Sequence, residues 1–260
     1  FIDSNIQYMD IVKYNKSAWD SYVDKKNRWT VAVSDEEIME AKQGKWSVIL
    51  TPTLSVPYSW FPTDLKKIKI LGLACGGGQQ GPILAALGAN VTIFDNSPKQ
   101  LGQDTKMAAK HNLPIDTIEG DMRDLSVFAD ESFDLIFNPC SIGFVDDILA
   151  IWKECYRVLK KDGILMTGLT NPLIFQIDEV TMRLKHKAPY SDKQSLSKEE
   201  LDKYMKNNEP LMFGHSWTDQ IGGQLQAGFM LTDMYEDNWD NTHLFDAYFP
   251  GFMATRSIKK

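Results

Sequence analysis

The sequence predicts an α/β fold, a doubly wound and mostly parallel sheet with helices on both faces. Short apolar runs alternate with segments of helical spacing from residue 67 onward. The apolar runs lack a polar face, which is typical of strands that helices cover on both sides. The segments between them are about 10–15 residues long, a length that favours parallel pairing through right-handed crossovers.

Seven strands are expected in this sheet. The first five are expected at residues 67–74, 90–95, 115–118, 133–138 and 164–169. The helices between them are expected at residues 79–87, 98–111 and 145–159. The sequence Lys-Lys-Asp-Gly at 160–163 is expected to separate the last helix from the fifth strand. Two terminal strands, at 228–237 and 250–259, complete the sheet.

Residues 1–65 precede this pattern and are expected to form an N-terminal helical cap on a domain that spans residues 66–260. The segment is aromatic-rich and carries four of the seven tryptophans. Ser34 and Glu37 form a capping box ahead of a short helix, which Gly44 is expected to end. A connector with three prolines follows and is expected to be extended.

Residues 172–212 interrupt the alternation of strands and helices. The segment is rich in lysine and has little apolar content. One interpretation is a solvated surface helix. The other is an insertion after the fifth strand that lies over the substrate side of a ligand site.

Composition and charge favour a soluble cytoplasmic protein. The net charge is −7, which argues against a nucleic-acid partner because neutralising phosphates needs a basic face. Three cysteines without a C-x-x-C pair are typical of reduced thiols. No run of 18 apolar residues occurs, so neither a membrane span nor a membrane partner is expected. The four histidines are scattered, so no metal site is expected.

The stretch ILGLACGGGQQGPILAAL at 70–87 predicts a strand, a glycine loop and a helix. Gly76, Gly78 and Gly81 have the G-x-G-x-x-G spacing, and such a loop lies where parallel sheets bind ligands. Asp95 ends the second strand 19 residues after Gly76, where a carboxylate accepts both hydroxyls of a ribose. These features serve NAD, FAD and S-adenosylmethionine equally, and Asp95 as a helix cap is the alternative.

The segment EGDMRDL after the third strand separates these cofactors. Asp121 lies where a carboxylate accepts a hydrogen bond from an adenine amine, and Met122 lies where a thioether packs on the ring. The fourth strand then ends in FDLIFNPCSIGF, and the next helix and strand read RVLKKDGIL.

The ordered motifs ILGLACGGG, VTIFD, EGDM, FDLIFNP and RVLKKDGIL resemble the class I S-adenosylmethionine-dependent methyltransferases over about residues 67–170. The resemblance implies a Rossmann-like methyltransferase fold, S-adenosyl-L-methionine as cofactor and a methylation reaction. The family's first motif often begins with an acid and a glycine, where this chain has Gly72 and Ala74. That acid commonly helps to hold the methionine end of the cofactor, a task for which Gln79 and Gln80 are alternatives.

The expected cofactor-binding residues combine these motifs with an aromatic pair on a helix of the cap, three residues apart. They are Trp19, Tyr22, Leu73, Ala74, Cys75, Gly76, Gly78, Gln79, Asp95, Asn96, Asp121, Met122 and Asn138. Trp19 and Tyr22 are expected either to fold over the sulfonium or to pack against the helices of the sheet.

Three residues are expected to be catalytic. Asn138 occupies the family's fourth motif and is expected either to orient the acceptor or to close the strand with a turn. His215 follows the insertion and is expected to act as a base or to begin a helix. Tyr190 lies in the insertion and is expected to line the pocket or to be exposed.

The sequence therefore predicts a transferase that methylates a small-molecule acceptor. Two other function classes stay open at this point. The glycine spacing and Asp95 also fit an NAD(P)-dependent oxidoreductase, and the altered first motif also fits a protein that binds S-adenosylmethionine without turnover. A methyltransferase acting on amines of RNA or protein is a third alternative.

Overall fold

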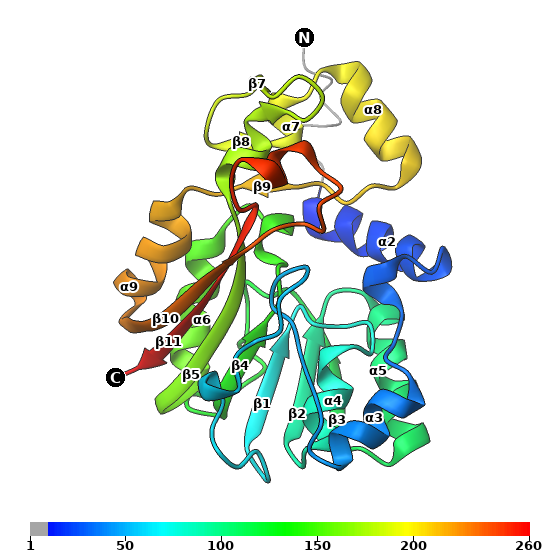
Figure 1. The fold of residues 1–260 in the computed structure, drawn as a ribbon, viewed down its shortest axis with the longest axis vertical. Helices are drawn as coiled ribbons and strands as arrows, with labels where there is room; N and C mark the ends of the chain where they lie inside the picture. Colours follow the sequence, from blue (N-terminus) through cyan, green and yellow to red (C-terminus); the bar gives the residue numbers. More distant parts are fainter. Residues whose placement is uncertain (1–9) are drawn as a thin grey trace.

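The computed structural model describes residues 10–260, so the first nine residues of the expected cap lie outside the described part. Seven strands form one sheet in the order β10-β11-β5-β4-β1-β2-β3 (Figure 1). They are β1 (Lys69–Leu73), β2 (Asn90–Asp95), β3 (Ile115–Glu119), β4 (Phe133–Asn138), β5 (Leu159–Thr170), β10 (Phe229–Asp237) and β11 (Phe252–Lys259). β11 alone runs antiparallel to its neighbours, so the expected mostly parallel, seven-stranded sheet is confirmed.

Helices cover both faces of this sheet. α4 (Gln80–Ala86) and α5 (Pro98–His111) pack on one face together with α3 (Asp35–Lys42). α6 (Ile148–Val158) and α9 (Gly223–Ala227) pack on the other face. The strands between them are almost wholly buried, which explains why their sequences lack a polar face.

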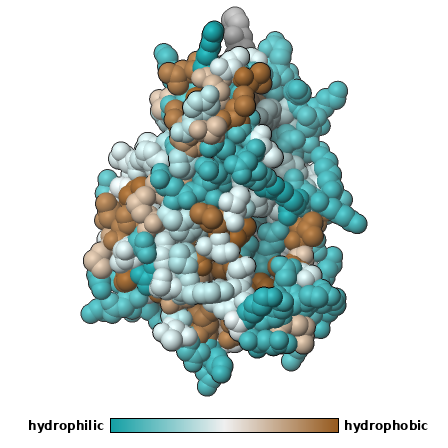
Figure 2. Space-filling view, viewed as in Figure 1, coloured by the Kyte–Doolittle hydropathy of each residue, from teal (hydrophilic) through white to brown (hydrophobic). Residues whose placement is uncertain are grey.

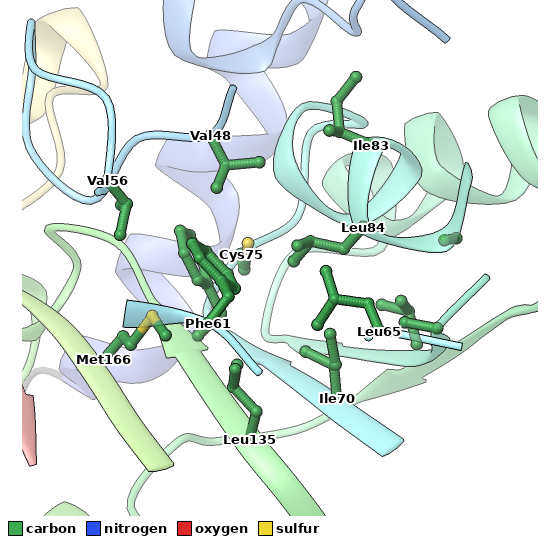
Figure 3. Close-up of a cluster of buried hydrophobic side chains, with 14 of the residues drawn as sticks. Val48, Val56, Phe61, Leu65, Ile70, Cys75, Ile83, Leu84, Leu135 and Met166 are labelled. Atoms are coloured by element: carbon green, nitrogen blue, oxygen red, sulfur yellow. The ribbon is translucent and has the colours of Figure 1, made fainter. Parts of the chain in front are cut away.

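The cap contributes to the core of the first face. α3 begins with the expected capping box between Ser34 and Glu37. Figure 3 shows Val48, Val56 and Phe61 pointing toward side chains of β1, β4 and β5. Burying an apolar side chain of this size stabilises a protein by about 1.5–3 kcal/mol. The connector that these residues belong to therefore replaces a covering helix on this part of the sheet.

Two element boundaries differ from the sequence prediction. The helix expected from residue 145 begins at Ile148, because the Asp147 carboxylate accepts hydrogen bonds from the backbone N–H groups of Leu149 and Ala150. The segment 160–163 belongs to β5 and does not interrupt it. Asp162 adopts φ 61°, and a register shift between β4 and β5 accommodates the extra residues.

Three segments gather at the carboxyl ends of the parallel strands (Figure 1). The first is α2 (Ile11–Asp24). The second is the expected insertion, which contains β6 (Ile177–Asp178), β7 (Arg183–Leu184), β8 (Tyr190–Ser191), α7 (Asp192–Ser195) and α8 (Lys198–Asn207), and then meets β9 (Phe213–Gly214). The third is the loop between β10 and β11, which contains the 3₁₀ turn Leu244–Ala247.

The face drawn in Figure 2 is mostly hydrophilic, with apolar residues in separate patches. None of the helices within residues 10–260 is long and apolar enough to cross a membrane.

Candidate active site

A cavity of about 780 Å³ opens at the carboxyl ends of the parallel strands. The chain runs from β1 through β2 to β3 on one side and then returns to place β4 on the other side of β1. Ligands bind beside such a reversal of strand order in open α/β sheets. Two parts of the lining differ in chemistry. We call them the loop half (residues 74–76, 79, 94–96, 100 and 120–122) and the aromatic half (residues 174, 175, 177, 190, 239, 243, 245 and 252).

The glycine loop between β1 and α4 has a backbone that other residues rarely adopt. Gly77 has φ 112° and Gly78 has φ 72°, both in the left-handed region. A Cβ atom on Gly76 would lie 2.7 Å from Cβ of Gln100 and 3.0 Å from Oδ2 of Asp95. The loop therefore lies directly against α5 and the end of β2.

Carboxylates of the protein accept the hydrogen bonds of three successive amides in this loop. The N–H of Gly76 donates to Oδ2 of Asp95 over 3.0 Å. The N–H groups of Gly77 and Gly78 both donate to Oδ2 of Asp104, each over 3.0 Å. A dinucleotide site uses the free amides of such a loop to bind a pyrophosphate. Here these amides already have partners in the carboxyl groups of Asp95 and Asp104, so they are not free to bind a pyrophosphate.

Asp95 lies where the sequence analysis placed a ribose acceptor. Its side chain lines the cavity and is 9% exposed. Oδ1 accepts from the N–H of Ser97 and Oδ2 from that of Gly76, and each carboxylate oxygen keeps a further lone pair. Burial raises the pKa of this carboxyl above its ordinary value, while hydrogen bonds from Ser97 and Gly76 oppose the rise.

Gln100 was not selected from the sequence. It lies on the first turns of α5, lines the loop half and is 5% exposed. Its Oε1 atom has no hydrogen-bond partner in the described part of the chain. An unsatisfied buried acceptor is costly, so this enclosed oxygen has a hydrogen bond to gain. The loop half thus combines a carboxylate, a free amide oxygen and no phosphate-binding amides from Gly76–Gly78, which fits a nucleoside without a pyrophosphate.

Asp121 and Met122 also line the loop half. The Asp121 carboxylate forms a bidentate ion pair with Arg123, with 2.6 Å from Nη2 to Oδ2 and 3.1 Å from Nε to Oδ1, and Arg123 also pairs with Asp146. The ion pair fixes the orientation of the Asp121 side chain. Met122 packs against the cluster that includes Phe94 of β2.

Gln79 and Gln80, the suggested substitutes for the missing acid, both bind the cap through their side chains. Nε2 of Gln79 donates to the carbonyls of Arg28 and Val31, each over 3.0 Å. Oε1 of Gln80 accepts from the N–H of Ile49. Although both residues line the cavity, their polar atoms attach residues 28–49 to the start of α4.

Trp19 and Tyr22 of α2 line the cavity on the cap side. Their rings meet edge to face with centroids 5.4 Å apart, and Trp19 makes a second such contact with Phe144. The hydroxyl of Tyr22 donates to the carboxylate of Glu209. Burial and this hydrogen bond both raise the pKa of the Tyr22 hydroxyl. α2 therefore covers the loop half with an aromatic surface and is bonded to the segment after α8.

Asn138 and His215 do not line the cavity, because backbone and side-chain partners engage their polar atoms elsewhere. Nδ2 of Asn138 donates to the carbonyl of Leu73 and to Oγ of Ser141, and Oδ1 accepts from Thr167. Nε2 of His215 lies 2.9 Å from the carbonyl oxygen of Val145 and 3.2 Å from that of Ile142. Both residues join the loop after β4 to neighbouring segments, and neither lines the cavity.

Tyr190 lines the aromatic half, as one of the sequence interpretations expects. Its ring stacks on Phe175 with centroids 5.3 Å apart, and its hydroxyl donates to Oδ1 of buried Asp192 over 2.7 Å. Burial is the main reason that the pKa of this phenol is raised. The hydrogen bond and the raised pKa make Tyr190 a neutral wall of the cavity, not a base.

The loop between β10 and β11 supplies further rings to the cavity lining. Trp239 stacks on Phe252 with centroids 5.2 Å apart, and His243 stacks on Phe245. Nδ1 of His243 lies 3.2 Å from Oε2 of Glu179, which belongs to the insertion. All these residues line the cavity. A histidine whose Nδ1–H is held by a carboxylate presents its other nitrogen as a proton acceptor.

Ten of the thirteen expected cofactor residues line the cavity: Trp19, Tyr22, Ala74, Cys75, Gly76, Gln79, Asp95, Asn96, Asp121 and Met122. Leu73, Gly78 and Asn138 do not, since Leu73 points into the core and Gly78 packs against Ala32 and α5. Asp104, Gln100, His243 and Glu179 were missed. Within residues 10–260 no group of three or more His, Cys, Asp or Glu side chains is arranged to hold a metal ion.

Comparisons with known proteins agree with this geometry. The family model described as a methyltransferase domain matches residues 71–167. The chain is 48% identical over 254 residues to the "Uncharacterized methyltransferase YbaJ" of Bacillus subtilis (strain 168), a match that covers 96% of this chain and 98% of that protein. It is 28% identical over 179 residues to a "Ubiquinone biosynthesis O-methyltransferase" of Actinobacillus pleuropneumoniae serotype 7 (strain AP76), covering 66% of this chain and 74% of that protein.

Solved structures show the same fold. An S-adenosylmethionine-dependent methyltransferase from Mesorhizobium loti superposes with a TM-score of 0.59 at 16% identity, covering 77% of this chain and 94% of that one. The 1,6-didemethyltoxoflavin-N1-methyltransferase of Burkholderia thailandensis, with bound 1,6-didemethyltoxoflavin and S-adenosylhomocysteine, gives 0.58 at 11% identity and covers 95% of this chain and 88% of that one. With the near full-length relative and the seven-stranded sheet, these findings establish that the chain belongs to the class I S-adenosylmethionine-dependent methyltransferases.

Proposed function

We propose that this enzyme methylates a planar aromatic small molecule that binds in the aromatic half of the cavity. The observation that carries the proposal is the two stacked ring pairs that line the cavity, Phe175 with Tyr190 and Trp239 with Phe252. Stacked and edge-to-face ring contacts are worth about 0.5–1.5 kcal/mol each beyond the area they bury. A flat aromatic acceptor gains such contacts with these rings, and an aliphatic acceptor does not.

The charges around the aromatic half support a neutral or cationic acceptor over a phosphorylated one. Lys185 pairs with Glu200 over 2.8 Å, and Asp192 accepts from Tyr190 and from the N–H of Met212. The cavity lining also includes Glu209. An anionic group here would meet several carboxylates and a lysine that already has a partner. The curated ubiquinone-biosynthesis relatives are named as O-methyltransferases, which agrees with an acceptor that carries a ring hydroxyl.

In this proposal the loop half holds the cofactor. When bound, S-adenosylmethionine supplies an electrophilic methyl group on a sulfonium sulfur. Asp95 and Gln100 offer acceptors for the hydroxyl and amino donors of the nucleoside, and Met122 offers an apolar surface for its ring. Trp19 and Tyr22 cover the site from α2 and exclude water from it.

The aromatic half orients the acceptor and removes its proton. Alignment of an acceptor with a bound methyl donor supplies much of the rate enhancement, because the reaction becomes effectively unimolecular. A ring hydroxyl or ring N–H becomes a better nucleophile as it loses its proton. His243 is the proposed base: Glu179 holds its Nδ1–H, and Nε2 accepts the proton. This role replaces the one expected for His215.

The two alternative functions are not favoured. An NAD(P)-dependent oxidoreductase needs donors for a pyrophosphate, and Asp95 and Asp104 already occupy the amides of Gly76–Gly78. A protein that binds the cofactor without turnover has no need of a second, aromatic compartment with a histidine–carboxylate pair.

A labelled-methyl assay tests the proposal. The purified enzyme is incubated with methyl-labelled S-adenosylmethionine and three panels: hydroxylated and N–H-bearing aromatic compounds, aliphatic alcohols and amines, and a mixture of peptides and tRNA. We expect label in one or more members of the first panel only. Label confined to either of the other panels would contradict the proposal.

A pair of tryptophan variants adds a control. Trp239→Leu removes one ring of the aromatic half, and Trp46→Leu removes a tryptophan that packs on Tyr58 and Phe61 of the cap. We expect Trp239→Leu to raise KM for the aromatic acceptor about tenfold, the size of one ring-stacking contact, while KM for S-adenosylmethionine stays unchanged. Trp46→Leu should leave both KM values unchanged.

A further inference from the structure

The carboxylate of Asp104 is the most unusual buried group near the cavity. It lies in the middle of α5, has an exposed fraction of 0% and does not line the cavity. Its Oδ2 atom accepts from the N–H groups of Gly77 and Gly78, and its Oδ1 atom has no partner in the described part of the chain. An apolar residue is the usual choice for such a position on a core-facing helix.

The residues around Asp104 leave space for its carboxyl group. A Cβ atom on Gly81 would lie 3.2 Å from Oδ1 of Asp104 and 2.6 Å from Cδ1 of Ile93. A glycine at 81 therefore leaves the space that the carboxyl group fills between α5 and the start of α4. The third glycine of the G-x-G-x-x-G pattern thus has a local explanation in this chain.

Residue 72 has no space for an acid of its own. A Cβ atom on Gly72 would lie 2.6 Å from Cδ1 of Ile93 and 3.3 Å from Cβ of Cys75. An acidic side chain there would have to displace the core of β2. The glycine loop instead obtains its carboxylates from Asp95 at the end of β2 and from Asp104 on α5.

Holding an ionisable group at this position is costly for the fold. Burial is the main reason that the pKa of Asp104 is raised to about 8, and the charge of Asp95 adds to this rise. Cys75, which faces the same pair, has its pKa raised by burial and by both carboxylates. A costly buried group beside a ligand cavity is a common mark of a functional role.

We propose that Asp104 is a positioning residue for the cofactor: it accepts the N–H groups of Gly77 and Gly78 and so holds the glycine loop in the shape that binds S-adenosylmethionine. Gly77 and Gly78 have left-handed backbones, and their amides point inward to Asp104; the N–H of Gly77 also lies 3.2 Å from the carbonyl oxygen of Gln100. With those amides held, Ala74, Cys75 and Gly76 form the wall of the loop half. The proposal rests on the cofactor and does not depend on the identity of the acceptor.

Three variants separate the hydrogen bonds from the charge. In Asp104→Asn the side-chain oxygen takes the place of Oδ2, and the amide nitrogen takes the place of Oδ1, which has no partner. The hydrogen bonds from the N–H groups of Gly77 and Gly78 are therefore kept. Asp104→Leu has a similar volume and accepts nothing. Asp104→Ala is a second acceptor-free variant in case the leucine prevents folding. The matched control is Asp134→Asn, because Asp134 accepts from the N–H of Lys69 at the opposite end of the sheet.

The readouts are the dissociation constant of S-adenosylhomocysteine by calorimetry and hydrogen exchange of residues 74–79 without ligand. We expect Asp104→Leu or Asp104→Ala to weaken binding at least tenfold and to speed loop exchange at least tenfold. Asp104→Asn should restore both to within about threefold of the wild type, and Asp134→Asn should change neither.

The outcomes distinguish the cofactor assignment from the role of Asp104. No binding by the wild type would overturn the cofactor assignment and this proposal together. Wild-type binding that persists unchanged in folded Asp104→Leu or Asp104→Ala would overturn the role of Asp104 alone. Asp104→Asn binding as weakly as the acceptor-free variants would also overturn it, because the hydrogen bonds would then not be the cause.

Discussion

Replacement of Asp95 by asparagine tests the ribose contact with the least disturbance of shape. The wild-type carboxylate accepts from Gly76 and Ser97, each over 3.0 Å, and has lone pairs left for donors in the cavity. Asparagine loses the charge and directs an N–H₂ group at one of the two backbone N–H groups. The variant therefore weakens the ligand contact and also one end of the loop.

The size of the effect follows from the kind of hydrogen bond that is lost. Hydrogen bonds to charged groups contribute about 1.5–3 kcal/mol. At about 1.4 kcal/mol per factor of ten, the dissociation constant of S-adenosylhomocysteine should rise roughly 10- to 100-fold. Because burial raises the pKa of Asp95, wild-type affinity should also fall as the pH is lowered through that raised pKa, and the variant should lack this dependence.

Calorimetric titration with S-adenosylhomocysteine measures the effect, and thermal unfolding without ligand shows whether the variant is folded. Asp134→Asn makes the same chemical change at the start of β4, where the carboxylate accepts from Lys69 and pairs with Lys160, and it should bind like the wild type. A folded Asp95→Asn variant whose dissociation constant stays within twofold of the wild type would refute the ribose contact.

Three other predictions concern stability, space and catalysis. Asp104→Asn should unfold at a higher temperature than the wild type by a margin that grows from pH 5 to pH 8. The folded pKa of Asp104 is about 8 and the unfolded value about 3.9, so over this interval the carboxyl is ionised in the unfolded state and still protonated in the folded state, which lowers the stability of the wild type as the pH rises. Gly72→Asp should lower the free energy of unfolding by about 1–3 kcal/mol, measured in denaturant, because its Cβ meets Ile93 at 2.6 Å. His243→Gln should lower kcat for an aromatic acceptor by about 100-fold or more with cofactor affinity unchanged, whereas His215→Gln should lower the unfolding temperature; the reverse pattern would contradict the assignment of the base.

The sequence predicted the sheet well because its central strands β1, β2 and β4 are largely buried on both faces. Such strands must be apolar throughout, and the glycine loop and Asp95 mark the carboxyl ends of the first two. The boundaries that failed depend on single side chains. Asp147 caps α6 later than the apolar pattern suggests, and Asp162 continues β5 through a positive φ.

The site was less predictable because its contacts join distant segments. Asp104 reads as an ordinary polar residue of an amphipathic helix, and only the folded loop brings Gly77 and Gly78 to it. Its one signal in the sequence is its place near the middle of a helix that packs on the sheet. His243 and Glu179 are 64 residues apart, and neither belongs to a motif.

His215 was favoured over His243 because it follows the insertion at an apparent helix start. In the structure both His215 contacts are to backbone carbonyls of the loop after β4, and His215 does not line the cavity. The sequence alone does not distinguish a histidine that holds a loop, as His215 does, from one proposed as a base, as His243 is. Only the partner atoms, carbonyls in one case and a carboxylate in the other, separate them.

The central claim is that the glycine loop binds an adenosyl sulfur compound and not a dinucleotide. Thermal unfolding of the wild type with S-adenosylmethionine, S-adenosylhomocysteine, NAD⁺ or NADPH, each at the same concentration, tests it most directly. A ligand at a hundred times its dissociation constant stabilises the fold by about 2.7 kcal/mol, which for a chain of this size raises the midpoint by about 5–10 °C. We predict such a rise with the two adenosyl sulfur compounds alone. A rise with NAD⁺ or NADPH alone would contradict the account, because the amides of Gly76–Gly78 would then have to leave Asp95 and Asp104 for a pyrophosphate.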